Sequence, residues 1–239
     1  MSKRIFLTMD LDWASEDVIE EALPSFDEFA LPLTVFQTHF SPNVQARAKS
    51  YPTELEWHPN FLEGSSQGAD SEKIDFYLQS IPSERKIVRC HLYYEPDSLP
   101  IFLNKNGIGA TSDDLSLLSH KSSYLKDGHQ EVPLFFEDGC YIKGGHPLDI
   151  RHVLSFMEEE GDYVFLFHPI HLAFNSIGYS LTRELKDNLP RETYWKLSHE
   201  FISSRKAKGY GMRRFANDLI RAFRSQGYGF YLLKETLHD

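Results

Sequence analysis

Carboxylate, histidine and arginine side chains recur directly after the short apolar runs of this 239-residue chain. The residues in this position are Asp10, Asp12, His58, Arg89, His91, Glu137, Asp138, His168 and His171. Imidazole nitrogens and carboxylate oxygens are ligands for Zn²⁺ and related metals, and the same groups act as general acids and bases. Their types and positions predict a hydrolytic metal site, provided that the fold brings them together.

Four of these residues could build a metal centre. Asp10 and Asp12 lie two positions apart at a strand end, so their side chains point roughly the same way. One could bind a metal while the other acts as a base. His58 and His91 could converge from neighbouring strands as nitrogen ligands. Two histidines and one carboxylate leave positions open for water and substrate, which is typical of a catalytic metal site.

Two further residues complete the predicted chemistry. A divalent metal lowers the pKa of its water and polarises a carbonyl. Arg89 near Asp10 would keep that carboxylate ionised and oriented. His168, on the opposite side, could protonate a leaving amine or alkoxide. The set therefore predicts hydrolysis of an acyl group.

The apolar runs alternate with helical patterns. We expect strands over 5–9, 33–38, 55–57, 87–90, 132–136, 163–167 and 228–233. We expect helices over 15–29, 43–50, 71–81, 97–105, 148–159, 192–203 and 212–225, with an irregular loop at 107–111 and an excursion at 169–190. Strands that alternate with helices form a parallel sheet, and a parallel barrel gathers its active site at the carboxyl ends of its strands.

This alternation predicts an α/β fold. We expect a distorted (β/α) barrel of about seven parallel strands, in one catalytic domain over residues 1–239, with an open doubly wound sheet as the alternative. The net charge of −10 argues against nucleic-acid binding through phosphates. Two cysteines, no secretory signal pattern and no apolar run of membrane-spanning length favour a cytoplasmic protein. Nothing in the sequence indicates an oligomeric state.

Four segments resemble the motifs of the polysaccharide deacetylases of carbohydrate esterase family 4. The segment from Thr8 to Trp13 resembles the motif Thr-Phe-Asp-Asp-Gly with one residue inserted, and Glu54 to Phe61 resembles the second motif. Arg89-Cys-His-Leu-Tyr93 resembles the third motif, Arg-x-Pro-Tyr, and Leu166-Phe-His168 the fifth, Leu-x-His. They occur in the family's order. The closest likeness is to the divergent branch found in bacterial O-antigen gene clusters.

The resemblance implies a role for each matched residue. Asp10 would be the catalytic base, Asp12 a metal ligand, Arg89 the residue that orients the base, and His168 the general acid. The cofactor would be a divalent metal, with Zn²⁺ the first candidate. The substrate would be an N- or O-acetylated saccharide, as a nucleotide sugar or a lipid-linked glycan precursor.

The sequence departs from the family at the second and third motifs. The second motif usually carries a further histidine four positions after the first, but here that position is Leu62. His91 replaces the proline of the third motif, so we take His58 and His91 as the nitrogen ligands. The fourth motif is matched only loosely, by the segment from Phe136 to Asp138.

Other residues could contact the substrate. These candidates are Trp13, Trp57, Tyr93, Glu137, Asp138 and His171. The two tryptophans flank the predicted site and could carry a sugar ring, although ordinary packing explains them equally well. Two other functions stay open: another metal-dependent barrel enzyme, such as a sugar isomerase or an amidase, and an inactive saccharide-binding homologue.

Two further patterns have a functional interpretation. Residues 64–68 match the nucleophile motif Gly-x-Ser-x-Gly, but the polar residues around it do not predict the strand and helix that this motif needs. A basic run over 205–214 precedes a helix. It could be a solvated face, or a phosphate site at the helix N-terminus that suits a nucleotide sugar.

Overall fold

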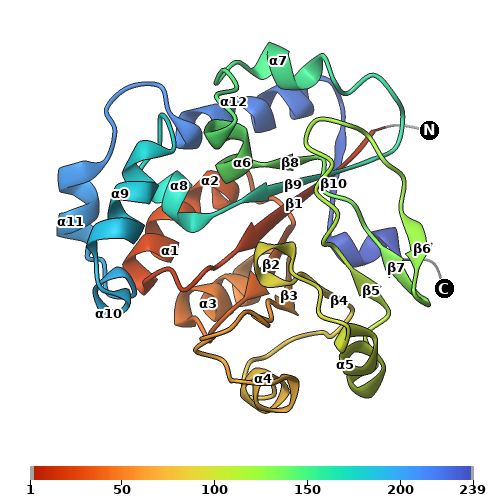
Figure 1. Ribbon diagram of the computed structural model, residues 1–239. Coiled ribbons are helices and arrows are strands. Elements are labelled where there is room, and N and C mark those ends of the chain that lie inside the picture. The colour runs from red at the N-terminus through yellow and green to blue at the C-terminus, as the bar shows by residue number, and fades with distance from the viewer. Residues whose placement is uncertain (1–2, 238–239) are drawn as a thin grey trace.

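A single curled sheet organises the computed structural model, which describes residues 3–237 (Figure 1). The strands are β1 (Arg4–Asp10), β2 (Leu33–Gln37), β3 (Thr53–Trp57), β4 (Ile87–Val88), β5 (Ala110–Thr111), β6 (Tyr124–Lys126), β7 (His129–Glu131), β8 (Phe136–Glu137), β9 (Asp162–Phe167) and β10 (Gly229–Tyr231). Across these residues the order is β6-β7-β5-β4-β3-β2-β1-β9-β8, with β10 also on β1. Every pair is parallel except the β6–β7 hairpin.

The sheet closes irregularly. β2 pairs with the second half of β1, and β10 pairs with its first half. On the far side, one parallel bridge joins Leu115, after β5, to Leu134, before β8. The fold is thus a mostly parallel, distorted barrel, which confirms the predicted α/β class. Its strand count exceeds the expected seven because several strands are only two or three residues long.

Helices cover the outside of the sheet. They are α1 (Glu16–Ala22), α2 (Pro24–Asp27), α3 (Pro42–Ser50), α4 (Ser71–Leu78), α5 (Leu99–Asn106), α6 (Asp138–Lys143), α7 (Ile150–Leu154), α8 (Pro169–Ala173), α9 (Ser180–Asn188), α10 (Arg191–Tyr194), α11 (His199–Arg205) and α12 (Met212–Ser225), with 3-10 turns η1 (His91–Tyr93) and η2 (Leu233–Thr236). Figure 1 shows α9, α10 and α11 beside α1 at one edge of the barrel. Throughout residues 3–237, each helix is too short or too polar to span a membrane.

Side chains alternate between two cores, as period-two strands require. On β9, Tyr163, Phe165 and Phe167 pack outward against the helices, while Val164 and Leu166 pack inside the barrel. On β1, Ile5, Leu7 and Met9 belong to the same outer core, and Phe6 is inside. The inward positions that follow Phe6 on β1 are polar, so the barrel interior changes from apolar to reactive toward its carboxyl end.

The structure corrects several expected elements. The expected helix over 15–29 is two helices, because Pro24 lacks the N–H that would continue α1 and instead begins α2. Of the strand expected over 132–136, only Phe136 belongs to β8, which continues to Glu137 and pairs with β9. The hairpin β6–β7 and the short β5 were not predicted, since strands of two or three residues carry too little periodicity. The six-residue helix α6 was not predicted either. The excursion at 169–190 contains α8 and α9.

Candidate active site

The carboxyl ends of β1, β3 and β4 bring Asp12, His58 and His91 together. Asp12 Oδ1 lies 3.2 Å from His58 Nε2 and 2.9 Å from His91 Nδ1, and the two nitrogens lie 3.4 Å apart. Ligands bound at ~2.0–2.1 Å are separated by about 3.3 Å around a tetrahedral ion and by roughly 2.9 Å around an octahedral one. The donor atoms and their separations therefore fit a divalent cation.

Two loops at this site have left-handed backbone. The φ angles are 46° and 56° at Asp12 and Trp13, and 55° and 57° at Leu92 and Tyr93. Residues other than glycine adopt this region at a cost of about 1–3 kcal/mol, and such residues cluster at functional sites. β1 ends at Asp10, so the left-handed turn, rather than strand alternation, sets the direction of the Asp12 carboxylate.

A fully buried arginine holds Asp10. Arg89 Nη1 donates to Asp10 Oδ1 at 2.8 Å and to the Thr8 hydroxyl at 2.9 Å. Its Nε and Nη2 donate to the Ser112 carbonyl and hydroxyl at 3.0 and 2.9 Å. The other Asp10 oxygen, Oδ2, lies 3.9 Å from His58 Nε2. One carboxylate oxygen is thus fixed from behind, and the other faces the metal ligands.

His168 faces the same ligands from β9. Its Nδ1 lies 2.6 Å from Asp138 Oδ1, and its backbone N–H donates to Asp138 Oδ2 at 2.8 Å. Its Nε2 lies 3.7 Å from Asp12 Oδ2. Burial alone would lower the pKa of His168, but the carboxylates of Asp138, Asp12 and Glu137 raise it to about 10. The raised pKa favours the protonated ring, whose Nε2 faces Asp12.

Glu137, Asp138 and His168 also lie close enough to hold an ion. Both Glu137 oxygens, however, cap α6 by accepting the N–H groups of Gly139 and Cys140 at 2.8 and 2.6 Å. Both Asp138 oxygens serve His168. This group is therefore occupied by the protein's own donors, and the Asp12 group is the better metal site.

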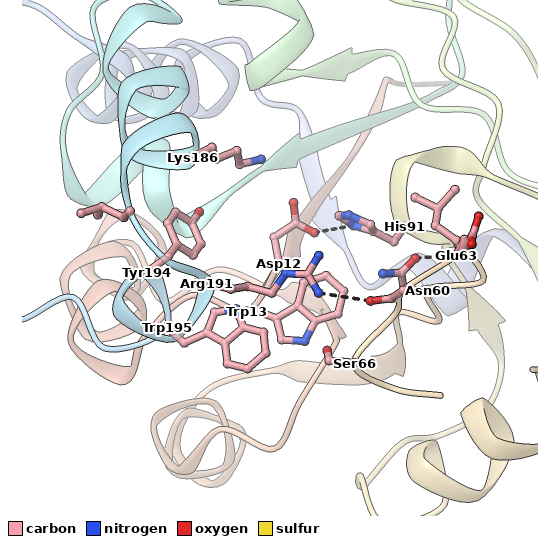
Figure 2. Close-up of a pocket in the computed structure, with 13 residues that line it drawn as sticks. Asp12, Trp13, Asn60, Glu63, Ser66, His91, Lys186, Arg191, Tyr194 and Trp195 are labelled. Atoms are coloured by element: carbon pink, nitrogen blue, oxygen red, sulfur yellow. Dashed lines mark hydrogen bonds and ion pairs between the residues drawn. The ribbon is translucent and has the colours of Figure 1, made fainter. Parts of the chain in front are cut away.

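Two cavities meet at the candidate metal-binding group of Asp12, His58 and His91. The inner one, of about 160 Å³, contains Asp10, His58 and His168, and the outer one measures about 430 Å³. Both are lined by Asp12, His91, Lys186 and Tyr194. Figure 2 shows the outer cavity between the metal ligands on one side and residues of α9 and α10 on the other. The ligand group thus lies where a substrate in either cavity would meet it.

Most of the expected substrate-contact residues reach these cavities. Trp13 lines the outer cavity, and Tyr93, Glu137 and His171 line the inner one. His171 is buried, with its Nδ1 3.2 Å from the Ser176 hydroxyl. Burial first, and then the nearby His168 and Lys186, lower its pKa well below the ordinary value. His171 is therefore neutral beside a charged histidine.

Two expected contacts lie elsewhere. Asp138 is fully buried behind His168 and holds that ring instead of facing a cavity. Trp57 is also fully buried: its Nε1 donates to the Ile81 carbonyl at 3.0 Å and its ring packs near Phe102. Trp57 is the last residue of β3 and His58 follows it, so the alternation of the strand turns the tryptophan outward where the histidine turns inward. The structure places it in the core beneath α4 and α5.

Sequence reasoning missed the wall formed by α9 and α10. Lys186, Tyr194 and Trp195 line the cavities there, and Arg191 donates to the Gly64 carbonyl at 3.1 Å. These residues belong to no strand end, so the positional argument could not find them. The pairing of Asp138 with His168 was missed as well, although the loose match to the fourth motif pointed to that segment.

The segment 64–68 is a loop, which excludes the nucleophile elbow. One of its residues has a supporting role instead. The Gln67 side-chain amide donates to the carbonyls of His58 and Thr38, both at 3.0 Å, and accepts the Asn60 N–H at 2.7 Å. Gln67 therefore fixes the backbone that carries His58.

The basic run does not form a phosphate site. Lys206 and Arg213 pair with Glu21, and Arg205 pairs with Glu184. At the start of α12, the N–H of Met212 donates to the Ser176 carbonyl at 2.8 Å, and a Cβ at Gly211 would clash with Asn175. The chain itself fills the helix N-terminus, and Arg205, Lys206 and Arg213 are held in ion pairs.

Comparison with known proteins identifies one family and several solved structures of similar fold. Residues 7–184 match the family described as WbmS-like polysaccharide deacetylase. Among solved structures, the chain is similar to WbmS of Bordetella bronchiseptica, a candidate polysaccharide deacetylase involved in O-antigen biosynthesis, with a TM-score of 0.73 and 23% identity. That alignment covers 91% of this chain and 90% of the other.

Two more distant structures share the fold. The Xyl-CE4 domain of a multidomain xylanase from the hindgut metagenome of Trinervitermes trinervoides gives a TM-score of 0.51 at 11% identity, covering 99% of this chain and 90% of that one. A peptidoglycan N-acetylglucosamine deacetylase gives 0.51 at 12% identity, covering 99% and 88%. Comparison with curated proteins found no match.

Proposed function

The chain belongs to the WbmS-like polysaccharide deacetylases of carbohydrate esterase family 4, and on that premise we propose that it is a metal-dependent hydrolase that removes an N- or O-acetyl group from a saccharide. The observation that carries this proposal is the meeting of Asp12, His58 and His91 within one cavity wall. A divalent metal there, with Zn²⁺ the first candidate, supplies Lewis-acid chemistry: it polarises a carbonyl and acidifies water.

Asp10 is the proposed base. Its free Oδ2 faces the metal ligands, while its Oδ1 is held by Arg89 at 2.8 Å. A base must lie within reach of the proton that it accepts, and a carboxylate that is already fixed in place needs little reorganisation to accept it. Asp10 would accept a proton from the attacking water, and Arg89 would keep the carboxylate in place.

His168 is the proposed acid. Its Nε2 points toward the site, and its Nδ1 is held by Asp138 at 2.6 Å. The raised pKa favours the protonated ring at neutral pH. His168 would donate its proton to the leaving amine or alkoxide as the bond to the acyl carbon breaks. The proposed base and acid thus reach the site from the ends of two paired strands, β1 and β9.

Metal analysis of the wild type and of His58→Ala and His91→Ala tests the proposal. We expect a near-stoichiometric divalent metal in the wild type, its loss in both variants, and release of acetate from acetylated saccharides by the wild type alone. Absence of metal after reconstitution would contradict the mechanism, and sugar binding by such a protein would indicate an inactive saccharide-binding homologue. A bound metal without acetate release would favour another metal-dependent barrel enzyme.

A further inference from the structure

The wall opposite the metal ligands is cationic. Lys186 lines both cavities, Arg191 lines the outer cavity and Lys143 the inner one. In the outer cavity, Lys186 and Arg191 equal the two carboxylates, Asp12 and Glu63, in number, although the protein as a whole has a net charge of −10. These cations lie where a substrate would contact the protein beyond the reacting acyl group.

Lys186 differs from the other charged residues of α9. Arg183 pairs with Asp187 at 3.4 Å, and Glu184 pairs with Arg205 at 2.9 Å. Among the residues that the structure describes, Lys186 has neither a hydrogen bond nor an ion pair to another side chain, and its ammonium group is available to a ligand. Lys186 is also the charged residue of α9 that lines the cavities.

Arg191 is similarly available. One of its guanidinium nitrogens donates to the Gly64 carbonyl at 3.1 Å, which leaves most of its five N–H donors free (Figure 2). Within residues 3–237 it has no carboxylate partner; Glu63 lines the same cavity but does not pair with it. The arginine spans from α10 to the loop after β3, and so lies over the cavity rather than outside it.

We propose that the outer cavity selects saccharides that carry an anionic group, a carboxylate or a phosphate, which binds between Lys186 and Arg191. The cavity, at about 430 Å³, is large enough for a sugar, and Trp13 and Trp195 supply apolar wall for its ring. Arginine and lysine are the side chains that bind carboxylate and phosphate most strongly. The inference rests on the proposed function, because it assigns the cavity beside the metal ligands to the substrate.

Binding of matched sugars to the metal-loaded protein tests this inference. The probes are N-acetylglucosamine, its 1-phosphate, and N-acetylglucosaminuronic acid, measured by calorimetry. We expect at least one anionic sugar to bind about tenfold more tightly than the neutral one, and Lys186→Met or Arg191→Met to remove most of that preference. The phosphate and carboxylate probes distinguish the two sources of charge.

Lys196→Met is the matched control. It removes the same charge from an exposed residue of the neighbouring segment that lines neither cavity, so the preference should persist. Lys186→Arg should retain the preference. Equal affinities for all probes, no binding of either anionic sugar at millimolar concentration, or a preference that survives both Met substitutions would overturn the inference.

Acetate release, measured separately, keeps the two proposals apart. Anionic preference without release would leave the binding inference standing and refute deacetylation of these sugars. Release from the neutral sugar without any preference would refute only the charge selection.

Discussion

Buried carboxylates occupy both ends of the barrel, but their surroundings differ. At the end of the barrel where β2 and β4 begin, which we call its amino-terminal end, Glu54 accepts from the Thr34 hydroxyl at 2.6 Å. Glu56 accepts there from the Ser83 hydroxyl and the Lys86 N–H at 2.9 and 3.0 Å. At the carboxyl end, Asp10 and Asp12 keep oxygens directed at histidines across a cavity.

The comparison shows what separates a structural acid from a functional one. Glu54 and Glu56 lie on the same face of β3, His58 follows directly after the strand in the same alternation, and all three are buried. Burial therefore does not distinguish a structural acid from a functional one. Glu54 and Glu56 use their oxygens to accept hydrogen bonds from the chain, whereas Asp10 Oδ2 and the Asp12 carboxylate face histidines at the carboxyl end, where a parallel barrel places its active site.

Replacing the proposed acid should give the largest effect on catalysis. His168→Ala removes the proton donor but leaves Asp12, His58 and His91 intact. We expect the rate of deacetylation to fall by about 10²–10⁴-fold with metal content unchanged. Steady-state kinetics and elemental analysis on the same samples measure both. Loss of the metal together with the activity would mean that His168 helps to bind the metal and is not a separate acid.

A smaller loss should follow from the residue behind the acid. Asp138→Asn keeps the size of the side chain but cannot accept both from the His168 ring and from its backbone N–H, since one amide position is a donor. We expect kcat to fall by roughly 10–100-fold, with the metal retained. An unchanged kcat would show that Asp138 only supports the fold, as Glu54 and Glu56 do.

The sequence predicted this end of the barrel better than the walls around it. Strand ends and polar residues are visible in one dimension, so the positions of Asp10, His58, His91 and His168 could be inferred. The contact between Arg89 and Asp10 was predicted as well, but which carboxylate oxygens stay free could not be inferred, because the partner of Asp138 comes from a distant segment. The helices α9 and α10 do not follow a predicted strand end directly, so the sequence did not indicate that Lys186 and Arg191 line the cavity.

At the amino-terminal end, removing a carboxylate should change stability rather than catalysis. Burial first, and then the neighbouring Glu54, raise the pKa of Glu56 from 4.5 to about 8. The folded state thus holds the Glu56 proton more tightly than the unfolded state. Its stability should fall as pH rises from about 4.5 to about 8, and then level off.

Glu56→Gln removes this titration. The unfolding free energy of the variant should exceed that of the wild type by roughly 1–3 kcal/mol near the upper end of that pH range, with kcat/KM unchanged. Urea unfolding at several pH values measures the difference. A wild-type stability that rises over the same pH range would mean that the fold stabilises Glu56 as a carboxylate. Glu56 would then be ionised, as Asp10 and Asp12 are proposed to be.

The smallest effects should separate the two tryptophans that flank the ligands in sequence. Trp57→Phe loses the hydrogen bond to the Ile81 carbonyl and should cost about 1–2 kcal/mol of unfolding free energy, with KM unchanged. Trp13→Phe keeps an aromatic ring but shortens the wall of the outer cavity, so KM should rise a few-fold while stability changes little. Each variant is the control for the other, because both remove one indole. If Trp57→Phe raised KM instead, the outward face of β3 would contribute to substrate binding, and alternation along the strand would no longer separate core from site.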